Sequence, residues 1–276
     1  MAQRHPLARL SLALIVLIVL AVIAAPLLTH HAAEGLGDPN PLAKLRPPGA
    51  EHLLGTDHLG RDLWARVLFG GRVSLSLALI VVIAAILIGV PLGAVAGYFG
   101  GWLDEFIMRV TDVFMAFPPL LLAIATAAAL GSGYLNCALA ITLSWWPWYT
   151  RLARAQALAL RERPFVEAAR AIGANDLAII RRHLLPHMAT PVLVQATLDF
   201  GSAILTVAAL SFLGLGVLPP TPDWGQLVNT GRLYFPERWW YATFPGLAIF
   251  ATTLAFNLFG DSLRQATDPK LARQWH

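Results

Sequence analysis

Residues 167–186 read EAARAIGANDLAIIRRHLLP and form an arginine-rich island between two long apolar segments. Residues 165–172 can form two turns of helix, and Gly173 is the residue type with which a chain leaves a helix in a left-handed conformation. The next two residues, Asn175 and Asp176, are both suitable caps for a second helix. The stretch therefore predicts a helix, a turn and a second helix that project from a membrane protein.

The first of these helices has small side chains and one acidic side chain. Ala168 and Ala169 leave one side of it nearly bare, which permits close approach by a partner, and Glu167 can offer a charge or a hydrogen bond there. An amphipathic helix that lies on the membrane surface is the alternative interpretation.

The composition places the chain in a bilayer. Of its 276 residues, 57% are hydrophobic and 13% are charged, and the mean hydropathy is +0.62, which is far more apolar than a typical soluble domain. The formal net charge of +4 comes from basic residues beside apolar spans. That distribution is typical of membrane topology and speaks against binding to nucleic acid.

Six apolar segments are long enough to be membrane spans. They cover residues 7–28, 73–98, 106–130, 134–152, 191–217 and 243–260. The first also has the outline of a signal peptide, but we expect an uncleaved span because no clear small-x-small cleavage site follows. Seven arginines in the loop between spans four and five, opposed by three acidic residues, predict that this loop is cytoplasmic. An even number of spans then puts both termini in the cytoplasm, as Arg4, Arg9, Arg264, Lys270 and Arg273 also indicate, and puts Asp223 outside.

The chain divides into three parts. Residues 1–72 hold the first span, a Pro-rich external loop and, over residues 51–72, an amphipathic segment with apolar residues at helical spacing. Residues 73–264 form a core of five spans, and residues 265–276 form a cytoplasmic tail. Within residues 51–72, Thr56 or Asp57 can act as a helix cap.

Ionisable residues inside spans are costly, so they usually face a cavity or a partner helix. Arg109 and Asp112 lie one turn apart and predict a local ion pair. Asp199 has no basic residue one turn away and is predicted either to make a structural hydrogen bond or to line the translocation path. Asn257 in span six is a weaker candidate for the same path, because a neighbouring helix easily satisfies an amide. Gly89, Pro91, Gly93, Pro118 and Pro119 predict kinks or close helix contacts in spans two and three.

Aromatic, histidine and cysteine residues are expected to be structural. Two clusters predict interfacial aromatic belts, one near the cytosolic end of span four and one in the loop after span five: Trp145, Trp146, Trp148 and Tyr149; Trp224, Trp239, Trp240 and Tyr241. Metal ligation is one interpretation of the four external histidines His30, His31, His52 and His58, but loop and cap roles are expected, so no metal site is predicted. Cys137 is expected to be a small buried hydrophobic residue.

The sequence has no Gly-Lys dipeptide, hence no phosphate-binding loop, and no His-Glu-x-x-His pair. It therefore cannot hydrolyse ATP alone. An ion-gradient-driven secondary transporter would show an inverted repeat with paired charged sites, and an intramembrane enzyme would show a nucleophile and base at matching depth. Neither sign is present.

The motifs together resemble the inner-membrane permease subunits of bacterial ABC importers. The family's cytoplasmic signature matches at Glu167, Ala168, Ala169, Gly173, Leu185 and Pro186, whereas His183 stands where the family usually has Ile. A second element, Gly-Thr-Asp-x-x-Gly-Arg-Asp at residues 55–62, resembles the dipeptide, oligopeptide and nickel branch. Further matches are Leu-Ser-Phe-Leu-Gly-Leu-Gly at residues 210–216 and the text at residues 257–264, so the resemblance covers about residues 54–271.

The resemblance implies the fold, the partners and the mechanism. It implies an all-α integral membrane protein with six transmembrane helices, a type I importer permease fold and cytoplasmic coupling helices between spans four and five. The partners implied are a homologous second permease, two ATP-binding cassette subunits that use ATP and Mg, and an extracytoplasmic substrate-binding protein, in a bacterial inner membrane. The chain itself is then a non-catalytic subunit without a cofactor. ATP binding would bring the two ATPases together, and the docked helices would rock the spans.

The cargo implied is nickel, a metal chelate, or a di- or oligopeptide. Peptide-importing members tend to carry Glu at the position of Val207 here, and the text around Asp199 looks more like that of nickel-importing members. The resemblance therefore favours nickel or a metal chelate over peptides.

Overall fold

The computed structural model describes residues 6–267, and it is helical with irregular connections over that range. The α-helices are α1 (Pro6–Ile23), α2 (Ala25–Leu28), α3 (Ala32–Leu36), α4 (Leu63–Phe99), α5 (Gly101–Met115), α6 (Pro119–Leu130), α7 (Tyr134–Leu160), α8 (Pro164–Ala171), α9 (Asp176–Ile179), α10 (Leu185–Phe212), α11 (Trp224–Gly231) and α12 (Trp240–Thr267). Short 3-10 turns lie at Pro41–Ala43 and Arg232–Tyr234, and a π-helical turn at Ile180–Leu184 joins α9 to α10. Arg4, Lys270, Arg273 and most of the predicted tail lie outside the described residues.

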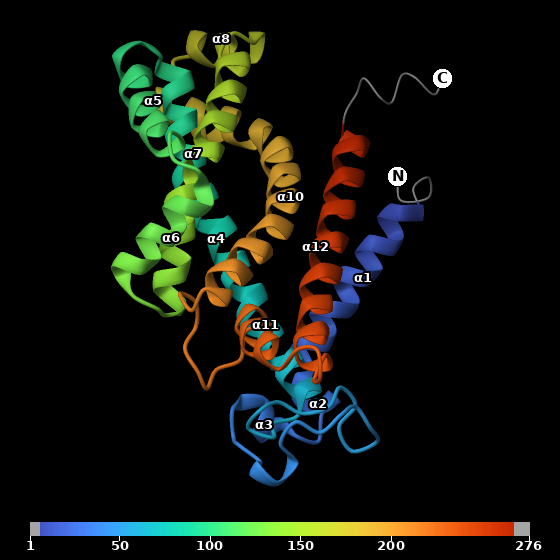
Figure 1. Cartoon of the computed structure of the whole chain (residues 1–276). Coiled ribbons are helices and arrows are strands. Elements are labelled where there is room, and N and C mark those ends of the chain that lie inside the picture. The colour runs from blue at the N-terminus through green and yellow to red at the C-terminus, as the bar shows by residue number, and fades with distance from the viewer. Residues whose placement is uncertain (1–5, 268–276) are drawn as a thin grey trace.

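The long helices run between two ends of the molecule (Figure 1). We call the end that carries α8 the α8 end, and the opposite end, with α2, α3 and α11, the α11 end. Helix α1 begins, and α12 finishes, toward the α8 end. The described ends of α1 and α12 therefore lie toward the end that carries the arginine-rich loop, and a cytoplasmic location of both termini stays a prediction.

Each predicted span corresponds to a helix or to a bent pair, with shifted bounds. Three helical segments are long and apolar enough to cross a membrane, at Leu63–Phe99, Asp176–Phe212 and Trp240–Thr267. The pair α5 and α6 adds a fourth if it counts as one span, and it is bent by 83° near the predicted break at Pro118 and Pro119. Two predicted spans remain. The first, residues 7–28, corresponds to a shorter apolar helix at Leu7–Ile23, and the fourth, residues 134–152, corresponds to α7, which extends further, to Leu160.

Among the described residues, helices α4 and α7 share the most extensive contact of any pair of elements. Gly89, Gly93 and Gly97 recur every fourth residue on one face of α4, and an added Cβ at Gly89 or Gly97 would lie 2.5–2.6 Å from the carbonyl oxygens of Trp146 and Arg154. The absence of side chains there lets the two backbones approach closely. Helix α4 continues through Pro91 without a break, so the glycines serve contact between helices rather than interruption of the span.

The predicted ion pair between Arg109 and Asp112 is wrong. Arg109 instead pairs with Glu105, at 3.3 Å, and Asp112 accepts a 2.6 Å hydrogen bond from Arg151 of α7. Arg154 of α7 also donates two hydrogen bonds to Asp104 of α5, at 2.5 and 2.7 Å. Arg151 and Arg154 of α7 therefore hold α5 against α7, because carboxylates of α5 lie within hydrogen-bond distance of both guanidinium groups.

Residues 51–72 do not form one amphipathic surface segment. Residues 51–62 make a folded loop, and the helix that follows is the start of α4, capped by Asp62, whose side chain accepts from Ala65 N at 2.8 Å. Thr56 and Asp57 therefore do not cap α4. Asp57 fixes the loop instead, because its Oδ1 accepts from Leu59 N and Arg61 N, and its Oδ2 from Arg61 Nε at 2.6 Å.

The two predicted aromatic belts are largely wrong. Trp224, Trp240 and Tyr241 are buried, and Trp224 Nε1 donates to Val67 O at 2.8 Å. In the other cluster Trp146 and Tyr149 are buried near the middle of α7, which extends to Leu160. These rings pack the interior because several elements converge on them, and the sequence does not show that convergence. Cys137 is buried, as expected.

Candidate functional site at the α8 end

Helix α8 ends in a Schellman turn built around Gly173. Gly173 has φ +81°, its N–H donates to Arg170 O at 2.9 Å, and Ala174 N donates to Ala169 O at 3.0 Å. These are the two reversed hydrogen bonds that satisfy the last carbonyls of a helix. Nothing lies within 4 Å of a Cβ added at Gly173, so the backbone conformation alone demands glycine at this position.

The second predicted helix is the beginning of a transmembrane helix. Asn175 caps it, with its side-chain oxygen accepting from Ala178 N at 2.8 Å, as predicted. The helix then runs through the π-helical turn at Ile180–Leu184 into α10. Pro186 in the first turn of α10 has no N–H to donate four residues back, which explains the widened turn before it. Leu185 is half-buried and Pro186 is exposed.

The two alanines of α8 lie on different sides. Ala169 is buried with Val166 against Ile179 and Leu184, so its small side chain serves the chain's own packing and not a partner. Ala168 and Glu167 are exposed. Within the described residues, Glu167 makes no side-chain hydrogen bond or ion pair.

Two large apolar residues accompany Glu167 on the exposed surface. Ile172 is 86% exposed and Leu177 is 63% exposed, one on each side of the Gly173 turn. We call the exposed residues Glu167, Ala168, Ile172, Gly173 and Leu177 the docking face. Because it combines a helix, apolar side chains and one carboxylate, it can bind a complementary groove.

The docking face is fixed to two membrane helices by contacts that the sequence analysis missed. Tyr98, near the end of α4, donates from its hydroxyl to Asp176 Oδ1 at 2.6 Å, and the Arg170 guanidinium lies over its ring at 5.2 Å. Phe165 of α8 stacks on His187 of α10, with ring centroids 4.7 Å apart. Tyr98 precedes this segment by about 70 residues, so no local pattern could reveal the contact.

Asp199 of α10 and Asn257 of α12 are both half-buried, and Asp199 lies beside Tyr149 of α7. Asp199 Oδ1 accepts from Gln195 Nε2 at 2.9 Å, whereas Asn257 lies against Gly201, since its Oδ1 would be 2.8 Å from an added Cβ. A hollow of about 330 Å³ between these helices is lined by Thr190, Pro191, Val194, Gln195, Leu198, Arg264 and Thr267. Gln195 lines this hollow and Asp199 does not, and a role in the translocation path stays a prediction for both Asp199 and Asn257.

The bundle of long apolar helices defines a polytopic membrane protein. The family model described as binding-protein-dependent transport system inner membrane component matches residues 89–273, and one described as the N-terminal TM domain of oligopeptide transport permease C matches residues 3–48. The chain belongs to this family of ABC transporter permeases and has its all-α type I fold.

Individual proteins agree with the family match. A probable D,D-dipeptide transport system permease protein of Escherichia coli (strain K12) is 45% identical over 98% of this chain and 90% of its own length. A glutathione transport system permease protein of Escherichia coli O6:K15:H31 (strain 536 / UPEC) is 42% identical over 98% of this chain and 88% of its own. The permease of an inward-facing methionine ABC transporter has the same fold, with a TM-score of 0.56 at 20% identity over 72% of this chain and 95% of its own. The family assignment replaces the alternative of an ion-gradient-driven secondary transporter.

Proposed function

We propose that this chain is the non-catalytic permease subunit of an ATP-driven importer and that the docking face binds an ATP-binding cassette subunit. The observation that carries the proposal is the exposed apolar and acidic surface around the Gly173 turn, on a segment fixed to α4 and α10. The chain itself binds no cofactor in this scheme. Two partner ATPases use ATP and Mg, and a homologous second permease forms the other half of the translocation pathway.

The contacts of the docking face suggest how movement would pass to the spans. An ATPase that displaces α8 also pulls on Tyr98 at the end of α4 and on the first turns of α10. Because α4 is locked to α7 through its glycine face, these helices would move as a unit. The hollow lies between α10 and α12, where such a movement would open or close a path.

The proposed orientation places the α8 end in the cytoplasm of a bacterium and the α11 end outside its inner membrane, where a substrate-binding protein would dock. Asp223 is unsuitable as an external marker because it is fully buried: its carboxylate accepts from Ser74 Oγ at 2.8 Å and from Gln226 N at 3.2 Å. Burial raises its pKa above the usual range. Leu42, at 89% exposure, is the better position.

We predict that single cysteines at Leu42 and Arg163, in a Cys137→Ala background, differ in accessibility. An impermeant maleimide should label Leu42→Cys on intact spheroplasts and should label Arg163→Cys only after lysis. Both positions are exposed in the chain, so the membrane is the barrier that separates them. Labelling of Arg163→Cys but not Leu42→Cys on intact spheroplasts would invert the orientation.

We expect Glu167→Arg to reduce recovery of the ATPase subunits with the tagged permease by about tenfold or more, because charge reversal at an interface costs at least 1–2 kcal/mol. The matched control is Glu162→Arg, which reverses an exposed charge just before α8, where Glu162 is 3.6 Å from Arg161. Equal recovery of the ATPases with both variants would argue against docking at this face.

For the cargo, we propose peptides or peptide-like molecules. The similar proteins carry dipeptide, peptide and glutathione names, and they do not support the preference for nickel. Val207 carries no selectivity in this chain because it is fully buried among Leu77, Val81 and Leu210. Val207, one of the features on which the nickel preference rested, is therefore part of the helix packing.

Uptake measurements test this cargo class. Cells with and without the chain would be given a labelled dipeptide, labelled glutathione, and radiolabelled nickel with and without a metallophore. We expect uptake of the dipeptide or of glutathione to depend on the chain, and uptake of nickel to be unchanged. Chain-dependent uptake of nickel alone would restore the metal preference without affecting the permease assignment.

A further inference from the structure

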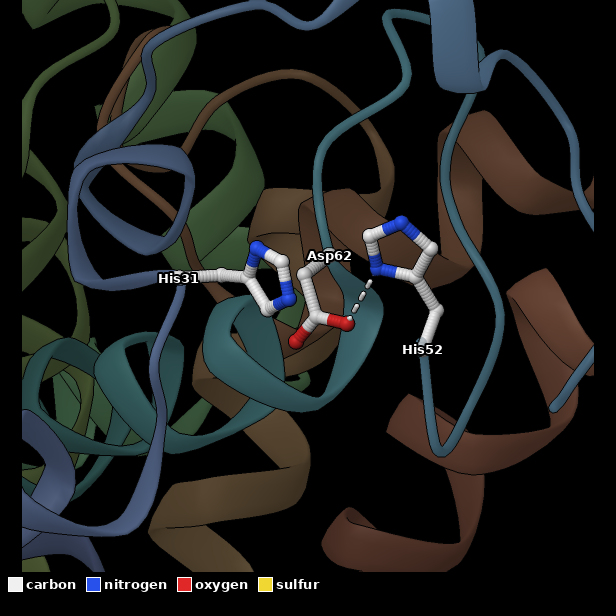
Figure 2. Close-up of side chains that lie close together, drawn as sticks. All are labelled: His31, His52 and Asp62. Carbon is white, nitrogen blue, oxygen red and sulfur yellow. Dashed lines mark hydrogen bonds and ion pairs between the residues drawn. The ribbon is translucent and has the colours of Figure 1, made fainter. Parts of the chain in front are cut away.

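We propose that His31, His52 and Asp62 bind one divalent transition-metal ion at the α11 end. His31 directly precedes α3, His52 lies in the loop before α4, and Asp62 is the N-cap residue of α4. One potential ligand atom from each lies within 4.8 Å of the others. Figure 2 shows the Asp62 carboxylate between the two rings, with one ring nitrogen of each histidine turned toward it.

The donor set selects the class of ion. Two imidazoles and one carboxylate suit zinc and its neighbours in the first transition row, whereas calcium and magnesium prefer oxygen ligands only. Ligands of a zinc ion stand about 3.3 Å apart when each is about 2.0–2.2 Å from the metal. His52 Nδ1 and Asp62 Oδ1 are already 2.9 Å apart, so mainly the third ligand must move.

Burial divides the three residues into two fixed ligands and one adjustable ligand. The His52 and Asp62 side chains are 3% and 2% exposed, whereas the His31 side chain is 28% exposed. The ring of His31 lies with its centroid 4.8 Å from that of His52. A small rotation of His31 therefore closes the site, and its exposed edge leaves a path for the ion and room for a water ligand.

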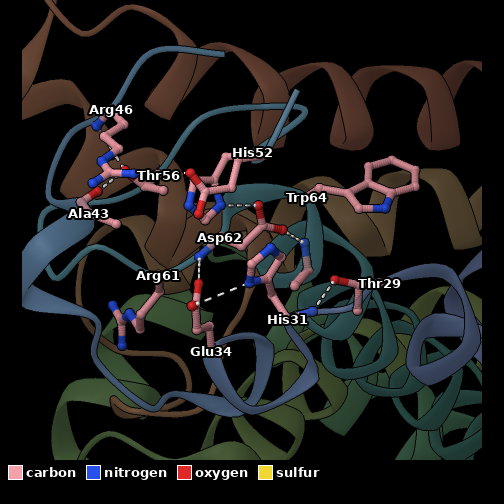
Figure 3. Close-up of polar contacts among 12 residues, drawn as sticks. Thr29, His31, Glu34, Ala43, Arg46, His52, Thr56, Arg61, Asp62 and Trp64 are labelled. Carbon is pink, nitrogen blue, oxygen red and sulfur yellow. Dashed lines mark hydrogen bonds and ion pairs between the residues drawn. The ribbon is translucent and has the colours of Figure 1, made fainter. Parts of the chain in front are cut away.

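A second layer of hydrogen bonds orients these residues (Figure 3). Glu34 Oε1 is 3.4 Å from His31 Nδ1, and Glu34 Oε2 accepts from Asp62 N at 2.7 Å. Asn40 donates to Glu34 Oε1 at 3.2 Å. A carboxylate on one nitrogen of a histidine fixes the tautomer that presents the other nitrogen's lone pair to a metal. Glu34 is thus a positioning residue for both His31 and Asp62.

Hydrogen bonding within the chain does not fully account for the cluster. His52 Nδ1 and Asp62 Oδ1 form a hydrogen-bonded pair at 2.9 Å, and Asp62 Oδ2 accepts from Ala65 N at 2.8 Å. The ring of His31 faces the same carboxylate without a hydrogen bond to it. A cation gives both rings and the carboxylate a common partner, and it would pin the segment after α2 to the start of α4. This structural ion is independent of the cargo.

The test is zinc binding by the full-length chain purified in detergent without a histidine tag. The protein is stripped with EDTA, freed of chelator and titrated with Zn²⁺ against a chromophoric competitor, and bound zinc is counted by mass spectrometry after gel filtration. We expect one Zn²⁺ per chain in the wild type. His31→Ala should weaken binding by more than about 100-fold and Glu34→Gln by about 10–100-fold, as is usual for residues that orient a ligand.

The matched control is His30→Ala, which removes an exposed neighbouring histidine outside the cluster and should leave the zinc affinity unchanged. His31 is also partly exposed, so its replacement should not impair folding, and an unchanged gel-filtration profile checks this. Absence of bound zinc in the wild type, or equal zinc affinity of His31→Ala and His30→Ala, would overturn the proposal.

Discussion

Replacement of Gly173 by valine is expected to lower substrate-stimulated ATP hydrolysis and transport by about tenfold or more, with normal membrane insertion. Gly173 has φ +81°, and a β-branched residue in that conformation costs about 1–3 kcal/mol. The chain can relieve this strain by opening the Schellman turn, which would re-aim α8 relative to α10. Since about 1.4 kcal/mol corresponds to a factor of ten, a tenfold loss of coupling lies within this range.

The matched control for that variant is Gly131→Val. Gly131 has φ +85° and, like Gly173, nothing within 4 Å of an added Cβ. It lies in the α6–α7 turn beside the α10–α11 loop, where Ser132 donates to Gly214 O at 2.8 Å. Valine is strained at Gly131 at least as much, because ψ 166° there belongs to a region that is nearly confined to glycine, but only Gly173→Val changes the docking face. Equal ATPase coupling in the two variants would show that the Gly173 turn is structural and does not transmit movement.

Replacement of Gly93 by alanine is expected to destabilise the chain by about 2–3 kcal/mol, at the upper part of the usual range for overpacking. The added Cβ would collide with the carbonyl oxygen of Thr150 and lie 2.8 Å from Ala153 Cβ. A backbone carbonyl cannot rotate away as a flexible side chain can, so α4 and α7 must separate. The measurement is the midpoint of thermal unfolding of the purified protein in detergent.

Gly246→Ala supplies the comparison for the Gly93 variant. Gly246 lies in α12 and has nothing within 4 Å of an added Cβ. Alanine there should be neutral or slightly stabilising, because alanine favours helix more than glycine does. If both variants unfold at the wild-type temperature, the glycine face of α4 is not closely packed in the protein.

The conformation around Gly173 was predictable because its determinants are local. Glycine at the end of a helix and Asn175 as the next cap each act within four residues. The same holds for the membrane character of the chain, which follows from long apolar segments. Local chemistry of this kind can be read without knowledge of the fold.

The direction that a side chain faces was less predictable. Ala169 was expected on the partner surface with Ala168, yet it is buried. Trp224 and Trp240 were expected at the membrane interface and lie inside the molecule. A helix offers several faces, and only the neighbouring elements decide which of them is covered.

By itself the sequence determined an all-α membrane protein, a short helix with a glycine turn in an arginine-rich loop, and motifs of the ABC permease family. Only the tertiary structure decided that Tyr98 holds Asp176, that Asp112 pairs with Arg151 rather than Arg109, and that His31 and His52 converge on Asp62. The first group depends on composition and on interactions between near neighbours along the chain. The contacts of the second group join residues that are from about 10 to nearly 80 positions apart in the sequence. How the helices and loops pack decides which of these residues come into contact.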